Sequence, residues 1–175
     1  MIYNLIDKRL GGEVKRFHTQ PMLREHLVSS HSWGVAMCVQ AIDPHCRKEL
    51  IMAALEHDVH EHITGDVNSI TLRLYPELKK VMMDIERKVN KKLGIHTELY
   101  ANEFQILRTA DLGDLVLCCL HEYEMGNKKA LVIVAGGLSY LGDFCTMSNT
   151  RQFYNELENH VISSVGVEEL DRVRR

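Results

Sequence analysis

The stretch EHDVHEHITGD, residues 56–66, carries the strongest indication of what this chain folds into. It places His57 beside Asp58, two side chains that commonly bind metal ions, within a helical pattern that covers residues 47–63. Adjacent residues on a helix point about 100° apart, so these two can share one ion only if other helices complete its coordination. The stretch therefore predicts a metal site built between packed helices.

The helical period extends from this stretch over most of the chain. It predicts helices over residues 2–10, 30–42, 47–63, 76–93, 97–125, 128–141 and 150–164. Gly11-Gly12 is expected to end the first helix, and Pro76 is expected to begin another. The stretch 13–27 is expected to be irregular, and the tail EELDRVRR exposed. Strand alternation is nearly absent, so the sequence predicts an all-α fold of six to eight helices.

Length and composition agree with a small globular protein. The chain has 175 residues, of which 45% are hydrophobic and 26% charged. This favours a single domain over 1–175, with a motif-bearing core over about 13–127 and C-terminal helices over 128–175. The net charge of −3 argues against the broad basic surface that nucleic-acid binders use, so we expect no nucleic-acid partner.

No segment of the sequence indicates a membrane partner. The N-terminus lacks the apolar region of a signal peptide, and LVIVAGGLSYLG (131–142) is too short and too rich in glycine to span a bilayer. The five cysteines are odd in number and form no C-x-x-C pair, which favours reduced thiols. We therefore expect a cytoplasmic protein.

Two further residues could complete the metal site. His31 stands near the start of the helix over 30–42, and Asp111 stands in an apolar helix where an unpaired carboxylate is costly to bury. Together with His57 and Asp58 they would form a mixed nitrogen and oxygen site, which suits cobalt, manganese, iron or zinc better than calcium. The alternatives stay open: a single histidine is more often a surface residue, and Asp111 could pair with Arg108.

Four segments, in this order along the chain, resemble the motifs of the HD-domain phosphohydrolase superfamily. These are KRFHTQP (15–21), VSSHSWGVA (28–36), EHDVHEHITGD (56–66) and RTADLGDLVLCCLHEYEMGN (108–127). They are most similar to the branch that contains bacterial 5′-deoxynucleotidases and phage dATP triphosphohydrolases. The resemblance implies an all-α enzyme in the cytoplasm of a bacterium or of a phage-infected host.

The resemblance also implies the metal ligands, which are His31, His57, Asp58 and Asp111. The ion would be Co²⁺, Mn²⁺ or Zn²⁺, and a triphosphate substrate leaves open a second ion, Mg²⁺. Ser30 stands where the branch usually has a glutamate before the first ligand histidine.

Other positions take their roles from the same resemblance. Glu61 matches the catalytic acid or base, and Asp66 is its rival. Arg16 matches the arginine that grips the phosphate, and Phe17 lies where the branch places an aromatic ring beside sugar and base. Asn68-Ser69 replaces a stretch that usually contains proline, so the substrate loop is expected to have a different shape.

The implied reaction is hydrolysis at the phosphorus bonded to the nucleoside 5′ oxygen. We expect a small-molecule deoxynucleotide substrate, dATP first, with release of deoxynucleoside and triphosphate. Lys79 and Lys80, together with Arg73, could bind the outer phosphates, although exposed helix lysines are an equally good interpretation. The alternatives are a 5′-deoxynucleotidase acting on monophosphates and a non-catalytic nucleotide sensor. Enzymes of this branch are commonly homo-oligomers, so a homo-oligomer is expected.

Overall fold

The computed structural model describes residues 2–95 and 98–174. Within these ranges every regular element is helical: α1 (Ile2–Gly12), α2 (Val28–Ile42), α3 (Lys48–Glu56), α4 (Glu61–Thr64), α5 (Ser69–Leu74), α6 (Pro76–Leu93), α7 (Ala101–Glu124), the 3₁₀ helix η1 (Lys128–Ala130), α8 (Leu131–Phe144), α9 (Ser148–Val165) and α10 (Val167–Arg174). The predicted all-α fold class is confirmed. In the described part of the chain, no helix is both long enough and apolar enough to cross a bilayer.

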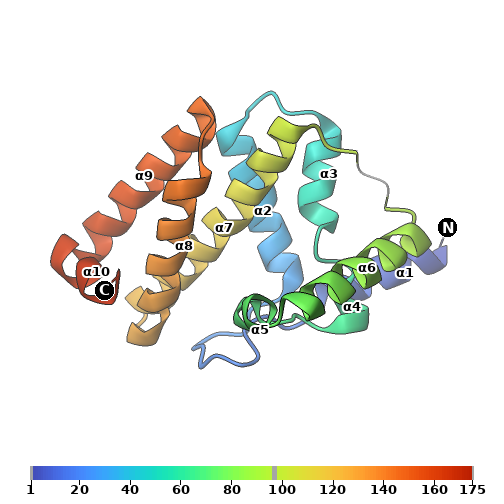
Figure 1. Ribbon diagram of the computed structural model, residues 1–175, viewed down its shortest axis with the longest axis horizontal. Helices are drawn as coiled ribbons and strands as arrows, with labels where there is room; N and C mark the ends of the chain where they lie inside the picture. Colours follow the sequence, from blue (N-terminus) through green and yellow to red (C-terminus); the bar gives the residue numbers. More distant parts are fainter. Residues whose placement is uncertain (1, 96–97, 175) are drawn as a thin grey trace.

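Helix α7 is the central element of the fold. It packs against α2 and α3 on one side and against α8 and α9 on the other (Figure 1). A first apolar cluster joins α7 to α2 and α3 through buried residues such as Val35, Leu50 and Ile106. A second cluster joins it to α8, α9 and α10, with Leu120 and Leu138 among its buried members. Residues on α7 can therefore contact side chains from the helices on both of its sides.

Helix α1 continues through the glycines that were expected to end it. A Cβ atom on Gly11 would lie 2.7 Å from the backbone oxygen of Val59, which is closer than real Cβ atoms approach. The helix ends at the second of these glycines, Gly12, two residues beyond the predicted end at residue 10. Gly11 lets α1 pack directly on the turn that contains His57 and Asp58.

The single helix predicted over 47–63 is divided, because α3 ends at Glu56 and α4 begins at Glu61. Between them the backbone forms tight turns in which each N–H bonds to the carbonyl three residues back, as in Val59 to Glu56 and Glu61 to Asp58. Local side chains favour these turns, since the Nδ1 atoms of His57 and His60 also bond to carbonyls three residues back. His57 and Asp58 thus lie in a turn, not on a continuous helix.

The other differences concern helix ends and two additional helices. The predicted start of the long helix at residue 97 lies outside the described residues, and α7 is described from Ala101. Neither α5 nor α10 was predicted. The tail expected to be exposed forms α10, and its Leu170 is buried in the cluster with α8 and α9. An apolar residue that packs between helices explains why the tail is ordered. Residues 13–27 form no helix, as expected.

Candidate active site

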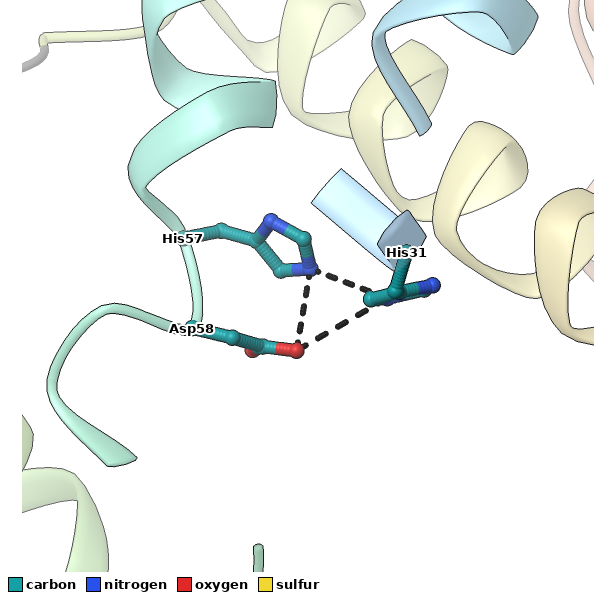
Figure 2. Close-up of side chains that lie close together, drawn as sticks. All are labelled: His31, His57 and Asp58. Atoms are coloured by element: carbon teal, nitrogen blue, oxygen red, sulfur yellow. Dashed lines mark hydrogen bonds and ion pairs between the residues drawn. The ribbon is translucent and has the colours of Figure 1, made fainter. Parts of the chain in front are cut away.

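Four polar side chains meet where α2, α7 and the turn after α3 come together. His31 is buried on α2, while His57 and Asp58 reach it from the turn (Figure 2). The two histidine Nε2 atoms lie 3.3 Å apart. The Nε2 atom of His57 is 3.2 Å from Oδ2 of Asp58, and that of His31 is 3.7 Å from the same oxygen. The predicted convergence of these three residues is therefore present in the structure.

The orientation of both rings leaves their Nε2 atoms free for a ligand. Nδ1 of His57 lies 2.8 Å from the carbonyl oxygen of Ala54, and Nδ1 of His31 lies 2.7 Å from Oδ2 of Asp114. Because both partners can only accept, Nδ1 of each neutral ring carries the proton, and each Nε2 presents a lone pair. In this neutral form, two lone pairs and a carboxylate oxygen face one another and repel unless a proton or a metal ion lies between them. These three residues could hold a metal ion, since their ligand atoms lie within 4.8 Å of one another.

Asp111 makes both of the contacts considered from the sequence, one with the metal-ligand cluster and one with Arg108. Its Oδ1 lies 3.2 Å from Nε2 of His31, at the edge of the metal-ligand cluster. Its Oδ2 accepts a 2.6 Å bond from Arg108, one helical turn away on α7. The arginine therefore orients the carboxylate with one oxygen directed at the histidine.

The electrostatics of the cluster favour a positive charge at its centre. Burial alone would lower the pKa of His57, but the carboxylates of Asp58 and Asp111 outweigh burial and raise it to about 9. Burial raises the pKa of Asp58, and His57, His31 and Arg16 more than reverse that effect, so its pKa is lowered. A carboxylate that stays ionised in a buried place is the oxygen ligand that a divalent cation requires.

Glu61 is a buried carboxyl group with an unused oxygen. Its Oε2 has no hydrogen-bond partner among the described residues, which is uncommon for a buried polar atom. Burial is the main cause that raises the pKa of Glu61, to about 8, and the negative charges of Asp58 and Asp66 add to it. A group with a raised pKa and a free oxygen beside a metal-ligand cluster has the properties of a proton-transfer group.

Arg16 and Phe17 lie on the irregular segment between α1 and α2. Phe17 has a φ of 57°, a left-handed conformation that is unusual for an aromatic residue. Its backbone N–H donates a 3.1 Å bond to Oδ2 of Asp66, which holds this strained turn in place. Arg16 acts electrostatically on the cluster, because its charge lowers the pKa of both Asp58 and Glu61. The loop thus brings a guanidinium group to the site from a distant part of the sequence.

A cavity of about 310 Å³ opens beside His31. Its lining includes Arg16, Phe17, Ser30 and His31, together with residues that the sequence did not single out. These are Arg24, His26, Leu27, Trp33, Asp114, Leu115, Leu117, Cys118 and His121. The wall combines aromatic rings with guanidinium groups, a lining suited to a ligand that has both a flat ring and negative charge.

The loop that carries Arg16 is held to α7 by Glu122. The backbone N–H groups of Leu23 and Arg24 donate to its carboxylate at 2.7 and 3.2 Å. Nε2 of His26 lies 3.0 Å from Oε1, and Asn127 donates to Oε2 at 3.1 Å. These bonds outweigh the cost of burial and lower the pKa of Glu122 to about 2. The motif that contains Glu122 and Asn127 therefore fixes one wall of the cavity.

Lys79 and Lys80, predicted to bind substrate, are exposed on α6 and line no part of this cavity. The structure does not bring them together with the cluster, and their role stays a prediction. Asn68 bonds to the backbone N–H of Ile70 at the start of α5 and donates to Thr19 in the Arg16 loop. Ser30 is exposed, and the carboxylate that bonds to His31 comes from Asp114 instead.

Among the residues that reasoning from the sequence missed are two carboxylates of α7, Asp114 and Glu122. Asp114 follows Asp111 by three residues, so the helical period places both on one face of an otherwise apolar helix. That spacing was a usable signal for Asp114. The function of Glu122 had no such signal, because its partners Leu23, Arg24 and His26 lie about a hundred residues earlier in the chain.

The similarity to known proteins agrees with this geometry. The family model described as 5′-deoxynucleotidase YfbR-like matches residues 8–159. Among solved structures, the chain is similar to the cyanophage S-2L HD phosphohydrolase DatZ bound to dA and one catalytic Zn²⁺ ion. The TM-score is 0.70 at 16% identity, covering 90% of this chain and 96% of that one, so the likeness concerns the fold. Among curated proteins, none matches. The four motifs and the family match lead to one conclusion: the chain belongs to the 5′-deoxynucleotidase YfbR-like family.

Proposed function

We propose that this protein is a metal-dependent deoxynucleotide phosphohydrolase that cleaves at the α phosphate, with dATP as its first substrate. The observation that carries the proposal is the position of the His31, His57 and Asp58 cluster beside a cavity lined by Arg16. A cation site next to a fixed guanidinium group suits a phosphate group, because both stabilise its negative charge.

The donor set fits a transition-metal ion. His31 and His57 would contribute Nε2 atoms, and Asp58 and Asp111 would contribute carboxylate oxygens. Co²⁺, Mn²⁺ and Zn²⁺ all accept this mixture, and Mg²⁺ would suit a second position on a triphosphate. When bound, such an ion lowers the pKa of a coordinated water and neutralises charge on the phosphate.

The side chains of this protein would perform the remaining steps. Arg16 would hold the α phosphate through charge-assisted hydrogen bonds. Glu61 would accept the proton of the attacking water, since its Oε2 is buried and has no other partner among the described residues. Phe17 and Trp33 in the cavity wall would contact the sugar and the base.

Asp66 is the rival of Glu61 for the proton, and its contacts favour a different function. Its Oδ2 accepts the backbone N–H of Phe17 and so holds the turn that carries Arg16. We therefore assign Asp66 to positioning of the loop and Glu61 to proton transfer. A Glu61→Gln variant is expected to keep metal affinity and lose turnover by about 10²–10⁴-fold. Metal content by mass spectrometry and single-turnover kinetics would test this. Retained turnover in Glu61→Gln would contradict the assignment.

The number of phosphates on the substrate separates two candidate functions. Arg24 lines the cavity together with Arg16, and a second guanidinium group would serve the outer phosphates of a triphosphate. The description of the family, 5′-deoxynucleotidase, supports the monophosphate alternative. The solved relative is described as bound to dA, the nucleoside that both reactions on deoxyadenosine nucleotides would release.

The deciding experiment supplies dATP and dAMP to the purified protein with Co²⁺ or Mn²⁺ and identifies the products by chromatography. Inorganic triphosphate from dATP would support the first function, and phosphate from dAMP alone would replace it with the second.

Arg24→Ala is expected to impair dATP hydrolysis selectively, whereas Arg16→Ala impairs both reactions. Lys79→Ala with Lys80→Ala tests the outer-phosphate role predicted for α6, and the exposed Arg87→Ala is the matched control. Metal binding without turnover on any nucleotide would favour a sensor.

We also propose that residues 1–175 form one HD domain that assembles into a homo-oligomer. Leu5, Ile6 and Leu10 on α1 are exposed, and apolar side chains grouped in this way are typical of an interface. Light scattering coupled to gel filtration would measure the assembly. A monomer at micromolar concentration would contradict the oligomer.

A further inference from the structure

Asp114 is the partner of the most buried histidine in the site. Its Oδ2 lies 2.7 Å from Nδ1 of His31, whose side chain is only 3% exposed. Among the described residues, the side chain of Asp114 makes no other hydrogen bond or ion pair. Its carboxylate therefore serves this one ring.

We propose that Asp114 is the positioning residue that prepares His31 to bind a divalent cation. A carboxylate can only accept, so it holds the proton of the neutral imidazole on Nδ1. The lone pair is then on Nε2, which faces His57 and Asp58. The same bond fixes the rotation of the ring. This inference rests on the proposed function, because the cation that His31 would bind is the metal ion of the proposed active site.

The two histidines differ in the strength of their support. Nδ1 of His57 bonds to the backbone carbonyl of Ala54, a neutral acceptor. Nδ1 of His31 bonds to a carboxylate, which makes Nε2 more electron-rich and a better ligand. Asp114 should therefore influence cation affinity more than its distance from the cation position suggests.

Gly34 explains how Asp114 comes so close to α2. A Cβ atom on Gly34 would overlap Oδ1 of Asp114 and would lie 2.6 Å from its Cγ. Gly34 follows His31 by three residues, so it lies on the same side of α2. Any larger residue there must displace the carboxylate that bonds to His31. The pair of Gly34 and Asp114 thus links helix packing to the chemistry of the ligand.

The first test measures cation binding with Co²⁺ alone, by calorimetry and by the visible absorption of the bound ion. Asp114→Ala is expected to weaken Co²⁺ binding by about 10–100-fold, as is typical when the partner of a ligand histidine is removed. Asp114→Asn should recover part of this loss, because its amide oxygen still accepts from Nδ1. Asp143→Ala, an exposed carboxylate on α8, is the matched control and should bind Co²⁺ like the wild type.

The second test displaces the carboxylate of Asp114 without replacing Asp114 itself. Gly34→Ala should weaken Co²⁺ binding in the same direction, and the double variant should be no weaker than Asp114→Ala alone. This non-additivity is expected because Gly34 acts through Asp114. Circular dichroism would verify that each variant is folded. Independent, additive effects would overturn the role of Gly34.

The third test needs no metal and no substrate. Nitrogen-15 spectra of the histidine rings at alkaline pH should show His31 protonated on Nδ1 in the wild type and a mixture of tautomers in Asp114→Ala. Unchanged Co²⁺ affinity together with an unchanged His31 tautomer would overturn the proposal. A wild type that binds Co²⁺ but hydrolyses no nucleotide would refute the proposed function and leave the positioning role intact.

Discussion

Helix α7 contributes carboxylates to two acid–histidine clusters that differ in their chemistry. Glu122 is surrounded by donors, since two backbone N–H groups, His26 and Asn127 all bond to its carboxylate. Asp111, three turns earlier, faces the Nε2 atom of His31, which itself faces the second histidine, His57. The hydrogen bonds of the first cluster are all made, whereas the second places acceptors against acceptors when both histidines are neutral.

This difference separates a structural site from a functional one. A buried charge whose hydrogen bonds are all made stabilises a fold, because its desolvation is offset by its partners. A group of ligand atoms that repel one another without a cation costs stability and is kept for binding. Mutations in the Glu122 cluster should therefore lower stability, and mutations in the metal-ligand cluster should lower metal binding and turnover.

The largest effect is expected at the metal-ligand cluster. Asp58→Ala removes the carboxylate that lies beside Nε2 of both His31 and His57, so it should abolish metal binding and reduce turnover by about 10³-fold or more. Elemental analysis and steady-state kinetics would measure this. An enzyme that retains its metal would contradict the ligand assignment.

A smaller loss is expected at Arg16, which we propose contacts the substrate and not the cation. Arg16→Ala should remove about 2–4 kcal/mol of transition-state stabilisation and keep Co²⁺ affinity. The ratio of kcat/KM between variant and wild type gives the first quantity, and calorimetry the second. If Arg16→Ala lost as much metal affinity as Asp58→Ala, the assignment of Arg16 to the substrate and not to the metal ion would be contradicted.

Glu122→Gln should show the opposite behaviour, with stability lost and metal affinity kept. The variant loses charge-assisted bonds to the loop over residues 21–26, which we expect to cost about 2 kcal/mol of unfolding free energy. Urea denaturation would measure the difference. The exposed Glu124→Gln, on the same helix, is the control and should be neutral.

The contribution of Glu122 should also depend on pH in a defined direction. Its pKa is lowered from 4.5 to about 2 in the folded protein, so the folded state favours the ionised form. The stability difference between wild type and Glu122→Gln is therefore complete above about pH 5 and shrinks as the pH falls toward 2. Denaturation curves at several pH values would test this, and a constant difference would contradict it.

The smallest effect is expected at Asn68, which connects the start of α5 to the loop that carries Arg16. Asn68→Ala removes the N-terminal cap of α5 and the bond to Thr19, for an expected cost of about 1 kcal/mol. Asn68→Asp keeps the cap and loses only the donor to Thr19. Thermal denaturation would rank the two variants, and equal losses would show that the cap contributes nothing.

Most helices and the family could be predicted from residues close together in sequence. The period of 3.6 residues identified α2, α6 and α9 within a few residues of their ends, and the motif around His57 and Asp58 identified the family. The division of the helix at His57 was missed, because the bonds that make its turns compete with ordinary helical ones. Helix α10 was missed because most of its residues are charged. Leu170 is its buried apolar residue, and that burial depends on packing against α8 and α9.

The sequence by itself determined the all-α class, the family and the residue types available for a metal site. Periodicity and motif spacing are local properties, so they can be recognised without knowing which helices meet. The tertiary structure alone decided which carboxylate serves which purpose. Asp114 reaches His31 from 83 residues away, and Glu122 reaches Leu23 from 99. Such pairings follow from helix packing, which sets the distance between side chains that no local pattern relates.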